Sequence, residues 1–122
     1  TITQEDVFHS DESKIRVILN NLFSNAFKFQ KDDSGKWIKI NIEVNSAGAM
    51  IEVSDNGIGI EERHKEDVFN LFHRATQRNV GSGLGLYMVK ESIEQLNGNV
   101  ILNSEPGVGT KVHVHLPDLL EL

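Results

Sequence analysis

Two glycine-rich segments constrain this chain more than any other feature of its sequence. Residues 55–60 read Asp-Asn-Gly-Ile-Gly-Ile, and residues 81–86 read Gly-Ser-Gly-Leu-Gly-Leu. Glycine lets the backbone approach a ligand closely and adopt dihedral angles that other residues reach only with strain. The second run leads into a segment with helical periodicity, whose first N–H groups would point at an anion. Together the two runs indicate a site where loops meet a phosphate-bearing ligand.

A polar stripe on the first predicted helix supplies groups for a cation and a phosphate. Apolar residues recur at helical spacing over residues 15–29, and Asp11 precedes them as an N-cap. On that helix Asn21, Asn25 and Lys28 lie within about 60° of one another. An amide oxygen can ligate Mg²⁺, which prefers hard oxygen ligands. The alternative interpretation of the same stripe is a solvated polar helix face.

Asp55 is the candidate for recognising a base. It follows a predicted strand with the same parity as Ile51 and Val53, so its carboxylate should face the core. A buried carboxylate needs a hydrogen-bond donor, and the amino group of adenine is a suitable one. Asn56-Gly57 is also a type I′ hairpin signal, although helix-forming residues rather than a returning strand follow it.

The run at 81–86 also has more than one interpretation. It is not a P-loop, because no Lys-Ser/Thr pair follows its last glycine. It is not a dinucleotide fingerprint, because no strand directly precedes it. A hinge without any ligand is the remaining alternative to phosphate binding.

Composition bounds the function classes. The chain has 122 residues, a net charge of −6 and no cysteine, which predicts one domain without disulfides or thiolate metal sites and fits a reducing cytoplasm. The negative charge argues against nucleic acid as a partner, and no apolar stretch could span a bilayer. A nucleotide site must therefore gather positive charge locally, from Lys28, Arg74 and Arg78, with His73 as a weaker candidate.

Apolar periodicity predicts an α+β fold: a two-layer α/β sandwich whose mixed, mostly antiparallel sheet has helices on one face. Strands are predicted at residues 7–9, 37–44, 50–54, 99–103 and 110–116. Long helices are predicted from the Asp11 cap to residue 29 or 30 and at 84–96, with short ones near 61–64 and 66–72.

With these residues assembled, the chain resembles the ATP-binding catalytic domain of sensor histidine kinases. The same ATPase fold occurs in DNA gyrase, mismatch-repair ATPases and the ninety-kilodalton heat-shock chaperones. Four segments stand in the family's order, at residues 21–29, 55–60, 68–74 and 81–86, and a turn ending at Gly109-Thr110 fits as well. The resemblance covers residues 1–122 as one domain. It implies a fragment of a longer protein, because Thr1 falls after the family's usual first helix and opening strand.

The resemblance implies a role for each matching residue. Asn25 would hold Mg²⁺, Lys28 would contact the terminal phosphates of ATP, and Asp55 would accept from the adenine amine. Phe29 stands where the family often has a tyrosine beside the base, and Arg74 would meet phosphate. The full implied nucleotide-binding set is Asn21, Asn25, Lys28, Phe29, Asp55, Gly57, Gly59, Ile60, Phe72, Arg74, Gly81, Gly83, Leu84, Gly85, Leu86 and Thr110.

The resemblance also implies partners. A two-component kinase donates the γ-phosphate of ATP to a histidine on a helical dimerisation domain, and a response-regulator aspartate then receives it. No histidine of this chain matches the acceptor motif, so no catalytic residue is expected within it. The implied domain is cytoplasmic, without nucleic-acid or direct membrane contact. The alternatives are a nucleotide-binding regulatory module, an anti-sigma-type serine kinase of the same fold, and an interaction domain whose glycines are hinges.

Overall fold

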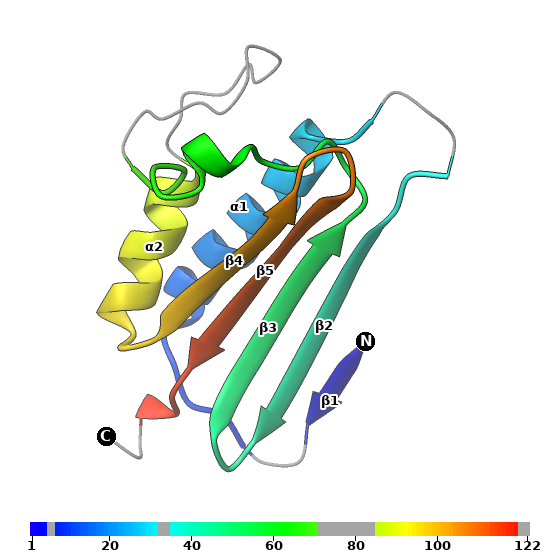
Figure 1. The fold of residues 1–122 in the computed structure, drawn as a ribbon. Helices are drawn as coiled ribbons and strands as arrows, with labels where there is room; N and C mark the ends of the chain where they lie inside the picture. Colours follow the sequence, from blue (N-terminus) through cyan, green and yellow to red (C-terminus); the bar gives the residue numbers. More distant parts are fainter. Residues whose placement is uncertain (5–6, 32–34, 71–84, 120–122) are drawn as a thin grey trace.

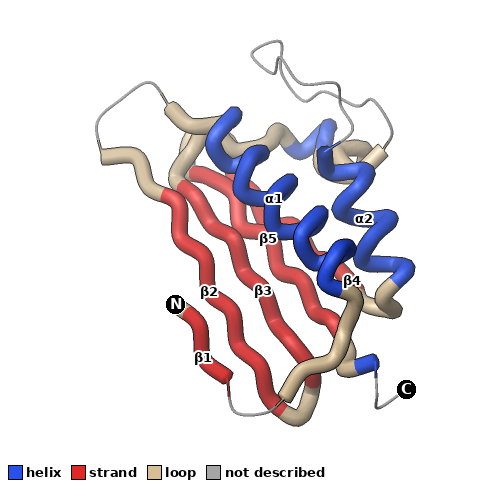
Figure 2. The backbone as a smooth tube through the Cα atoms, turned by 180° about the vertical axis from the view of Figure 1, so that it is seen from behind, coloured by secondary structure: helices blue, strands red, loops and turns tan. Residues whose placement is uncertain are grey.

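The computed structural model describes residues 1–4, 7–31, 35–70 and 85–119. In chain order these residues form β1 (Ile2–Gln4), α1 (Glu12–Lys28), β2 (Ile38–Asn45), β3 (Gly48–Asp55), the 3₁₀ helix η1 (Glu62–His64), α2 (Gly85–Gln95), β4 (Asn99–Glu105) and β5 (Gly109–Leu116). The strands make one sheet, and α1 and α2 cover one of its faces (Figure 1). The view from behind shows the two helices side by side across the strands (Figure 2). The predicted α+β sandwich with helices on one face is confirmed.

The sheet is mixed and mostly antiparallel, as predicted. Its strand order is β1-β2-β3-β5-β4, with β1 parallel to β2 and the other neighbouring pairs antiparallel. Asp55 pairs with Thr110, and Thr110 pairs with Ser104. These three residues share the strand parity of residues that pack in the core, such as Val53 and Leu102. Their side chains therefore form one row at the end of the sheet, on its helix-covered face.

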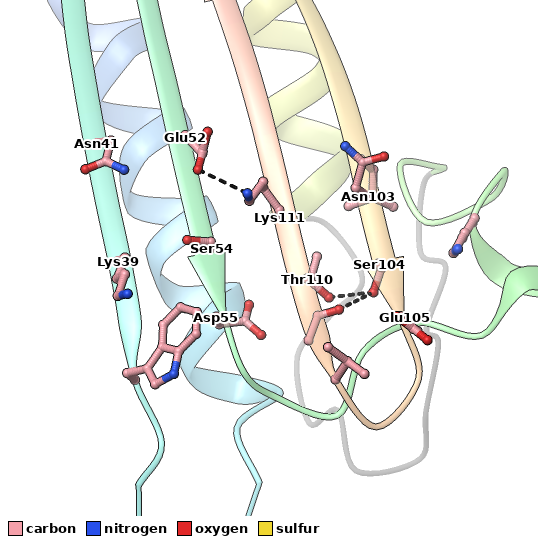
Figure 3. A pocket seen from close by; sticks show the side chains of 15 residues that line it. Lys39, Asn41, Glu52, Ser54, Asp55, Asn103, Ser104, Glu105, Thr110 and Lys111 are labelled. Atoms are coloured by element: carbon pink, nitrogen blue, oxygen red, sulfur yellow. Dashed lines mark hydrogen bonds and ion pairs between the residues drawn. The ribbon is translucent and has the colours of Figure 1, made fainter.

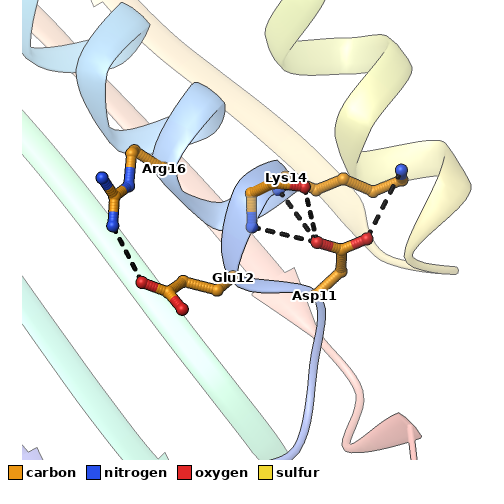
Figure 4. A network of polar contacts seen from close by, with 5 residues as sticks. Asp11, Glu12, Lys14 and Arg16 are labelled. Carbon is orange, nitrogen blue, oxygen red and sulfur yellow. Dashed lines mark hydrogen bonds and ion pairs between the residues drawn. The ribbon is translucent and has the colours of Figure 1, made fainter.

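Helix α1 begins at the predicted N-cap. Asp11 Oδ1 accepts hydrogen bonds from the backbone N–H groups of Ser13 at 2.9 Å and Lys14 at 3.4 Å, and from the Ser13 hydroxyl at 2.7 Å (Figure 4). These bonds satisfy donors that have no partner within the helix. The hydrogen bond from the Ser13 side chain is the main cause that lowers the pKa of the Asp11 carboxyl. In the first turn, Arg16 also pairs with Glu12 at 2.8 Å.

An apolar core lies between the helices and the sheet. Its buried members are Ile18, Leu22, Ala26, Val44, Ala49, Ile51, Val53, Val89, Ile93, Leu96, Val112, Val114 and Leu116. Fully burying one large aliphatic side chain contributes about 1.5–3 kcal/mol, so the helices are held firmly against the strands and against each other. No described helix combines the length and the hydropathy that crossing a membrane requires.

Two of the expected elements were wrong. Residues 7–9 form no strand; the backbone carbonyl of His9 instead accepts from Leu119 N at 3.0 Å. The strand that opens the sheet is β1, which pairs with residues 42–44 of β2. Residues 66–70, the described part of the helix expected at 66–72, form successive turns because their hydrogen bonds span three residues, as in Asp67 N to His64 O at 3.0 Å.

Candidate functional site

The end of α1 and the loop after β3 meet through their backbones. Ile58 N donates to Phe29 O at 2.9 Å. Gly57 is buried at this contact, where an added Cβ would overlap Phe29 O and lie 2.9 Å from Asp55 Oδ1. Because Gly57 has no Cβ, the end of α1 and the loop after β3 can form direct backbone contacts. The hairpin alternative for Asn56-Gly57 is contradicted, because no strand returns after this pair and the chain continues to η1.

Asp55 lies half-buried at the end of β3. Its Oδ1 accepts a hydrogen bond from Gly57 N at 2.8 Å. Burial raises the pKa of the Asp55 carboxyl above its ordinary value, and backbone N–H groups of Gly57 and Thr110 oppose that rise. The site thus holds an anionic acceptor in a partly desolvated position, where a hydrogen-bond donor from a ligand gains more than it would in water.

The loop between β3 and η1 is held from the far side by the β4–β5 turn. Gly107 N donates to Ile58 O at 2.8 Å, and Ile60 N donates to Ser104 Oγ at 2.8 Å. Gly59 has a φ of +74°, and an added Cβ there would overlap Glu105 O. Backbone geometry alone therefore requires glycine at position 59. These contacts hold the loop in one position beside the site. The side chain of Ile60, the last residue of the segment 55–60, is buried.

The polar stripe of α1 lies beside the start of α2. An added Cβ on Gly85 would lie 3.3 Å from Asn21 Oδ1, and Asn21 Nδ2 donates to Val17 O at 2.7 Å. Asn25 is half-buried on the same side of α1, while Lys28 is exposed in its last turn. The N-terminus of a helix carries partial positive charge. This end of the site therefore combines amide oxygens, an ammonium group and a helix N-terminus, a set that suits an anion with a bound cation.

Of the sixteen predicted nucleotide-binding residues, eleven lie in the part of the chain that the structure describes. They come from α1, from the segment 55–60, from the first residues of α2 and from the start of β5: Asn21, Asn25, Lys28, Phe29, Asp55, Gly57, Gly59, Ile60, Gly85, Leu86 and Thr110. Phe72, Arg74, Gly81, Gly83 and Leu84 lie outside the described residues, as do Arg78 and His73.

Sequence reasoning missed two residues that organise this site. Asn56 Oδ1 accepts from Trp37 N at 2.8 Å, and Asn56 Nδ2 donates to Gly35 O at 3.0 Å, which ties the start of β2 to the site loop. Ser104 Oγ lies 2.7 Å from Thr110 Oγ1 (Figure 3). The only sequence signal for Ser104 is its position opposite Thr110 across the Pro/Gly turn at 106–109, and that signal depends on knowing the register.

A cavity of about 630 Å³ opens on the helix-free face of the sheet. Two of its charged groups pair with each other: Glu52 lies 3.6 Å from Lys111 (Figure 3). Glu52 also pairs at 2.8 Å with His113, which does not line the cavity, and Lys39 Nζ lies 4.6 Å from the Trp37 ring centroid. Of the predicted residues, Asp55 and Thr110 line this cavity, together with Ser104, whereas the other nine that the structure describes do not. The helix-side region, rather than this cavity, is the candidate site.

The described residues also limit how a metal could be held. They contain no group of three or more His, Asp or Glu side chains that could hold an ion. Asn25 offers a single amide oxygen. Mg²⁺ commonly takes one or two protein ligands and completes its shell with water and substrate phosphates. The residues present therefore fit Mg²⁺ carried with a nucleotide and do not form an all-protein metal cage.

The sequence matches one family model, and it is similar to curated sensor histidine kinases. A family model described as histidine kinase-, DNA gyrase B-, and HSP90-like ATPase matches residues 10–120. The chain is 39% identical over 112 residues to the sensor histidine kinase TmoS of Ectopseudomonas mendocina, covering 88% of this chain and 11% of that protein. It is 35% identical over 113 residues to the sensor histidine kinase WalK of Bacillus subtilis, covering 88% of this chain and 18% of that protein.

Solved structures show the same likeness. The mycobacterial sensor histidine kinase MprB superposes with a TM-score of 0.77 at 26% identity, covering 95% of this chain and 83% of that chain. The catalytic domain of the histidine kinase ThkA gives a TM-score of 0.77 at 24% identity, over 96% of this chain and 76% of that chain, which is a likeness of fold. The chain spans less than a fifth of the length of the curated relatives TmoS and WalK.

Proposed function

The chain belongs to the family of histidine kinase-, DNA gyrase B- and HSP90-like ATPases, and we propose that it is the Mg²⁺-ATP-binding catalytic domain of a two-component sensor histidine kinase. The observation that carries this proposal is the meeting of three segments on the helix-covered face. The end of α1 bonds to the loop at 55–60, and its polar stripe lies against Gly85 at the start of α2. Those are the segments on which such a domain would hold a nucleotide.

In this proposal, the end of the site at Asp55 binds the base, and the end at the start of α2 binds the phosphates. Asp55 accepts a hydrogen bond from the amino group of adenine, and Gly57 leaves room for the approach of the base. Lys28 and the N-terminus of α2 face the phosphates. Asn25 contributes one ligand to Mg²⁺, which neutralises phosphate charge when bound. Local positive charge is needed here because the chain carries a net charge of −6 and ATP is itself strongly anionic.

Phosphoryl transfer depends mostly on positioning and charge neutralisation, which are the properties this domain supplies. The acceptor is a histidine on a helical dimerisation domain elsewhere in the full-length protein, and a response-regulator aspartate receives the phosphoryl group next. The bond between the γ-phosphorus and the β–γ bridging oxygen breaks, a phosphorus–nitrogen bond forms, and ADP leaves. We place the domain in the cytoplasm, where ATP is available.

The nucleotide part of the proposal is tested by calorimetry on the 122-residue chain. We expect ADP and Mg²⁺-ATP to bind with micromolar affinity, and Asn25→Ala to weaken Mg²⁺-ATP more than metal-free ADP. Asn20→Ala is the matched control, because Asn20 is an exposed asparagine on the same helix. Equal losses for the two ligands in Asn25→Ala would contradict metal ligation, and no binding heat with folded protein would contradict the whole proposal.

The transfer part needs the full-length protein with radiolabelled ATP. A phosphohistidine is labile in acid and stable in base, so we expect label that acid removes. Acid-stable label would indicate serine phosphorylation, and nucleotide binding without any protein label would indicate a regulatory module. Either result would overturn histidine kinase activity while leaving the nucleotide site intact.

A further inference from the structure

A row of three polar side chains lines the cavity on the helix-free face of the sheet. The strand register places Lys39 opposite Ser54, and Ser54 opposite Lys111. These residues therefore form one row across β2, β3 and β5, with the serine between two lysines (Figure 3). The cavity has a volume of about 630 Å³, which lies within the range of small-molecule pockets, roughly 300–1,000 Å³. The proposed nucleotide lies on the other face of the sheet and leaves this row without a function.

Ser54 is buried in the middle of this row and lacks a hydrogen-bond partner. It is only 7% exposed, although its strand parity directs it away from the helices. Within the described ranges, its hydroxyl forms no hydrogen bond with another residue. A buried polar group without a hydrogen bond costs free energy. Because Ser54 lines the cavity, an acceptor bound there would satisfy its hydroxyl.

The side chains of Lys39 and Lys111 can both reach a group bound above Ser54. Neighbouring strands lie about 4.8 Å apart, so the backbones of the two lysines, two strands apart, are separated by about 10 Å. Each lysine side chain is long enough to cover half of that distance. Lys39 Nζ lies 4.6 Å from the centroid of the Trp37 ring, and this contact with a ring face leaves its N–H donors available.

The ion pair of Lys111 does not prevent it from contacting a ligand. Lys111 Nζ lies 3.6 Å from Glu52, and both side chains are partly exposed to solvent. Exposed ion pairs contribute little to stability, so Lys111 can exchange this partner at low cost. Glu52 would still have His113 at 2.8 Å, so its carboxylate would not be left without a partner.

The remaining charged groups of the cavity lie farther from Ser54 or already have partners. The Asp55 carboxylate accepts a backbone hydrogen bond at 2.8 Å at the end of β3. Lys65 is held in an ion pair at 2.7 Å. Glu105 is exposed on β4, the edge strand two positions from β3 in the sheet. The charges nearest to Ser54 in its own row are therefore two ammonium groups, which favour an anion.

An apolar area borders the same cavity. Trp37 and Val108 both line it, and both are exposed large hydrophobic residues. Trp37 immediately precedes β2, and Val108 immediately precedes β5. The register places both at the end of the sheet where β3 ends. A ligand with an aromatic or apolar body could therefore cover exposed apolar surface here while its charged group lies above the row.

We propose that this cavity is a second ligand site, which binds a small aromatic phosphate monoester. The phosphate group lies above Ser54 between Lys39 and Lys111, and the aromatic ring packs against Trp37. Lysine binds phosphate well as a point charge, whereas the planar fork of arginine is better matched to a carboxylate. The hydroxyl of Ser54 donates to a phosphate oxygen. This site lies on the face of the sheet opposite to the proposed nucleotide, so it does not depend on the proposed function.

The test is a titration of the 122-residue chain with phenyl phosphate at constant ionic strength. ADP is present in excess so that the nucleotide site is filled. Trp37 is the sole tryptophan, and its fluorescence reports binding in this cavity. We expect a saturable change with a dissociation constant on the order of 1 mM, as suits a ligand of this size. The backbone amide signals of Ser54 and Lys111 in NMR spectra should shift with the same dissociation constant.

Variants of the row are compared by NMR, because Lys39→Ala also alters the surroundings of Trp37. Ser54→Ala should raise the dissociation constant about tenfold, since it removes a hydrogen bond to a charged group. Lys39→Ala and Lys111→Ala should each raise it up to about fivefold, as expected for a partly exposed ion pair. Lys90→Ala is the matched control, at an exposed lysine of α2. Thermal melting checks that each variant is folded.

Benzoate tests the class of anion, because it keeps the ring and replaces the phosphate with a carboxylate. We expect it to bind more weakly than phenyl phosphate. Benzoate that binds equally well would overturn the assignment to phosphate esters. An absent or non-saturable response of the wild-type chain would overturn the site itself, as would wild-type affinity in both Ser54→Ala and Lys39→Ala.

The outcomes also separate this inference from the proposed function. Phenyl phosphate that ADP displaces would lie in the nucleotide site, which would overturn the second site and leave the proposed function intact. If the wild-type chain does not bind ADP, the proposed function fails. Saturable binding of phenyl phosphate that Ser54→Ala weakens and Lys90→Ala does not would still support the second site in that case.

Discussion

Replacing Asp55 with asparagine should make the chain more stable and bind nucleotide less well. The substitution keeps the shape of the side chain and one acceptor oxygen, so the hydrogen bond from Gly57 N, 2.8 Å long in the wild type, can persist. It removes the charge and replaces the second oxygen with an NH₂ donor. Stability and affinity should therefore move in opposite directions, which makes this variant a strict test.

The stability effect follows from the pKa of the Asp55 carboxyl, which burial raises above its ordinary value of 3.8. Between 3.8 and the folded-state pKa, the native protein binds more protons than the unfolded chain. Stability therefore falls as pH rises through this window, and the ionised carboxylate remains a cost at neutral pH. Asn cannot ionise, so Asp55→Asn should be more stable than wild type at pH 7, and the difference should shrink as pH is lowered toward 3.8.

The affinity effect follows from the lost acceptor. A hydrogen bond to a charged group contributes about 1.5–3 kcal/mol, which corresponds to a dissociation constant for ADP raised about 10- to 150-fold. Calorimetry measures this loss. Urea unfolding, followed by the fluorescence of Trp37, the sole tryptophan, measures stability at each pH. Asp67→Asn, at an exposed aspartate, is the control.

Two results would refute the reasoning. Wild-type affinity for ADP in folded Asp55→Asn protein would remove the adenine role assigned to this carboxylate. Lower stability than wild type at pH 7 would show that the carboxylate is a net stabilising group in the native state, contrary to the desolvation argument.

Three further changes test the fold. Gly59→Ala should destabilise the chain by about 2 kcal/mol or more, since it adds positive-φ strain and a clash with a backbone carbonyl. Gly107→Ala, at positive φ in open space, should cost only about 1 kcal/mol; equal losses in urea unfolding would contradict the clash. Leu116→Ala should cost about 2–5 kcal/mol because Leu116 is fully buried, whereas Ile101→Ala, 55% exposed, should cost far less. Asp11→Ala should lower the melting temperature at pH 7 more than Asp11→Asn does. The difference in melting temperature between wild type and Asp11→Ala should disappear as pH falls below 3.8 through the lowered pKa of this carboxyl. A difference that persists at that pH would exclude the charged cap as its cause.

Much of the fold follows from local patterns in the sequence. The spacing of apolar residues from Ile15 to Phe29, with Asp11 before them, predicts α1 to within one or two residues of its observed bounds. The alternation in residues 110–116 predicts β5 and the face it buries. Helix caps and side-chain periodicity depend on residues a few positions apart, so the sequence carries them directly.

Other features depend on partners far away in the chain. Residues 7–9 have the composition of a strand, yet the strand that opens the sheet is Ile2–Gln4, because a backbone segment becomes a strand only where another strand presents free N–H and C=O groups. The role of Ser104 also depends on residues that are distant in the chain. Nothing local distinguishes it from other loop-flanking serines until the register places it opposite Thr110 and beneath Ile60 N.

Local sequence patterns specify the two long helices, most of the strands and the ordered set of glycine, asparagine and aspartate residues that indicates a nucleotide site. The position of β5 between β3 and β4, and the resulting row of Asp55, Thr110 and Ser104, depend on tertiary contacts. This difference follows from the range of the interactions. Local propensity acts within a few residues, whereas strand order, register and hydrogen-bond direction are set by groups that are distant in the chain and adjacent in space.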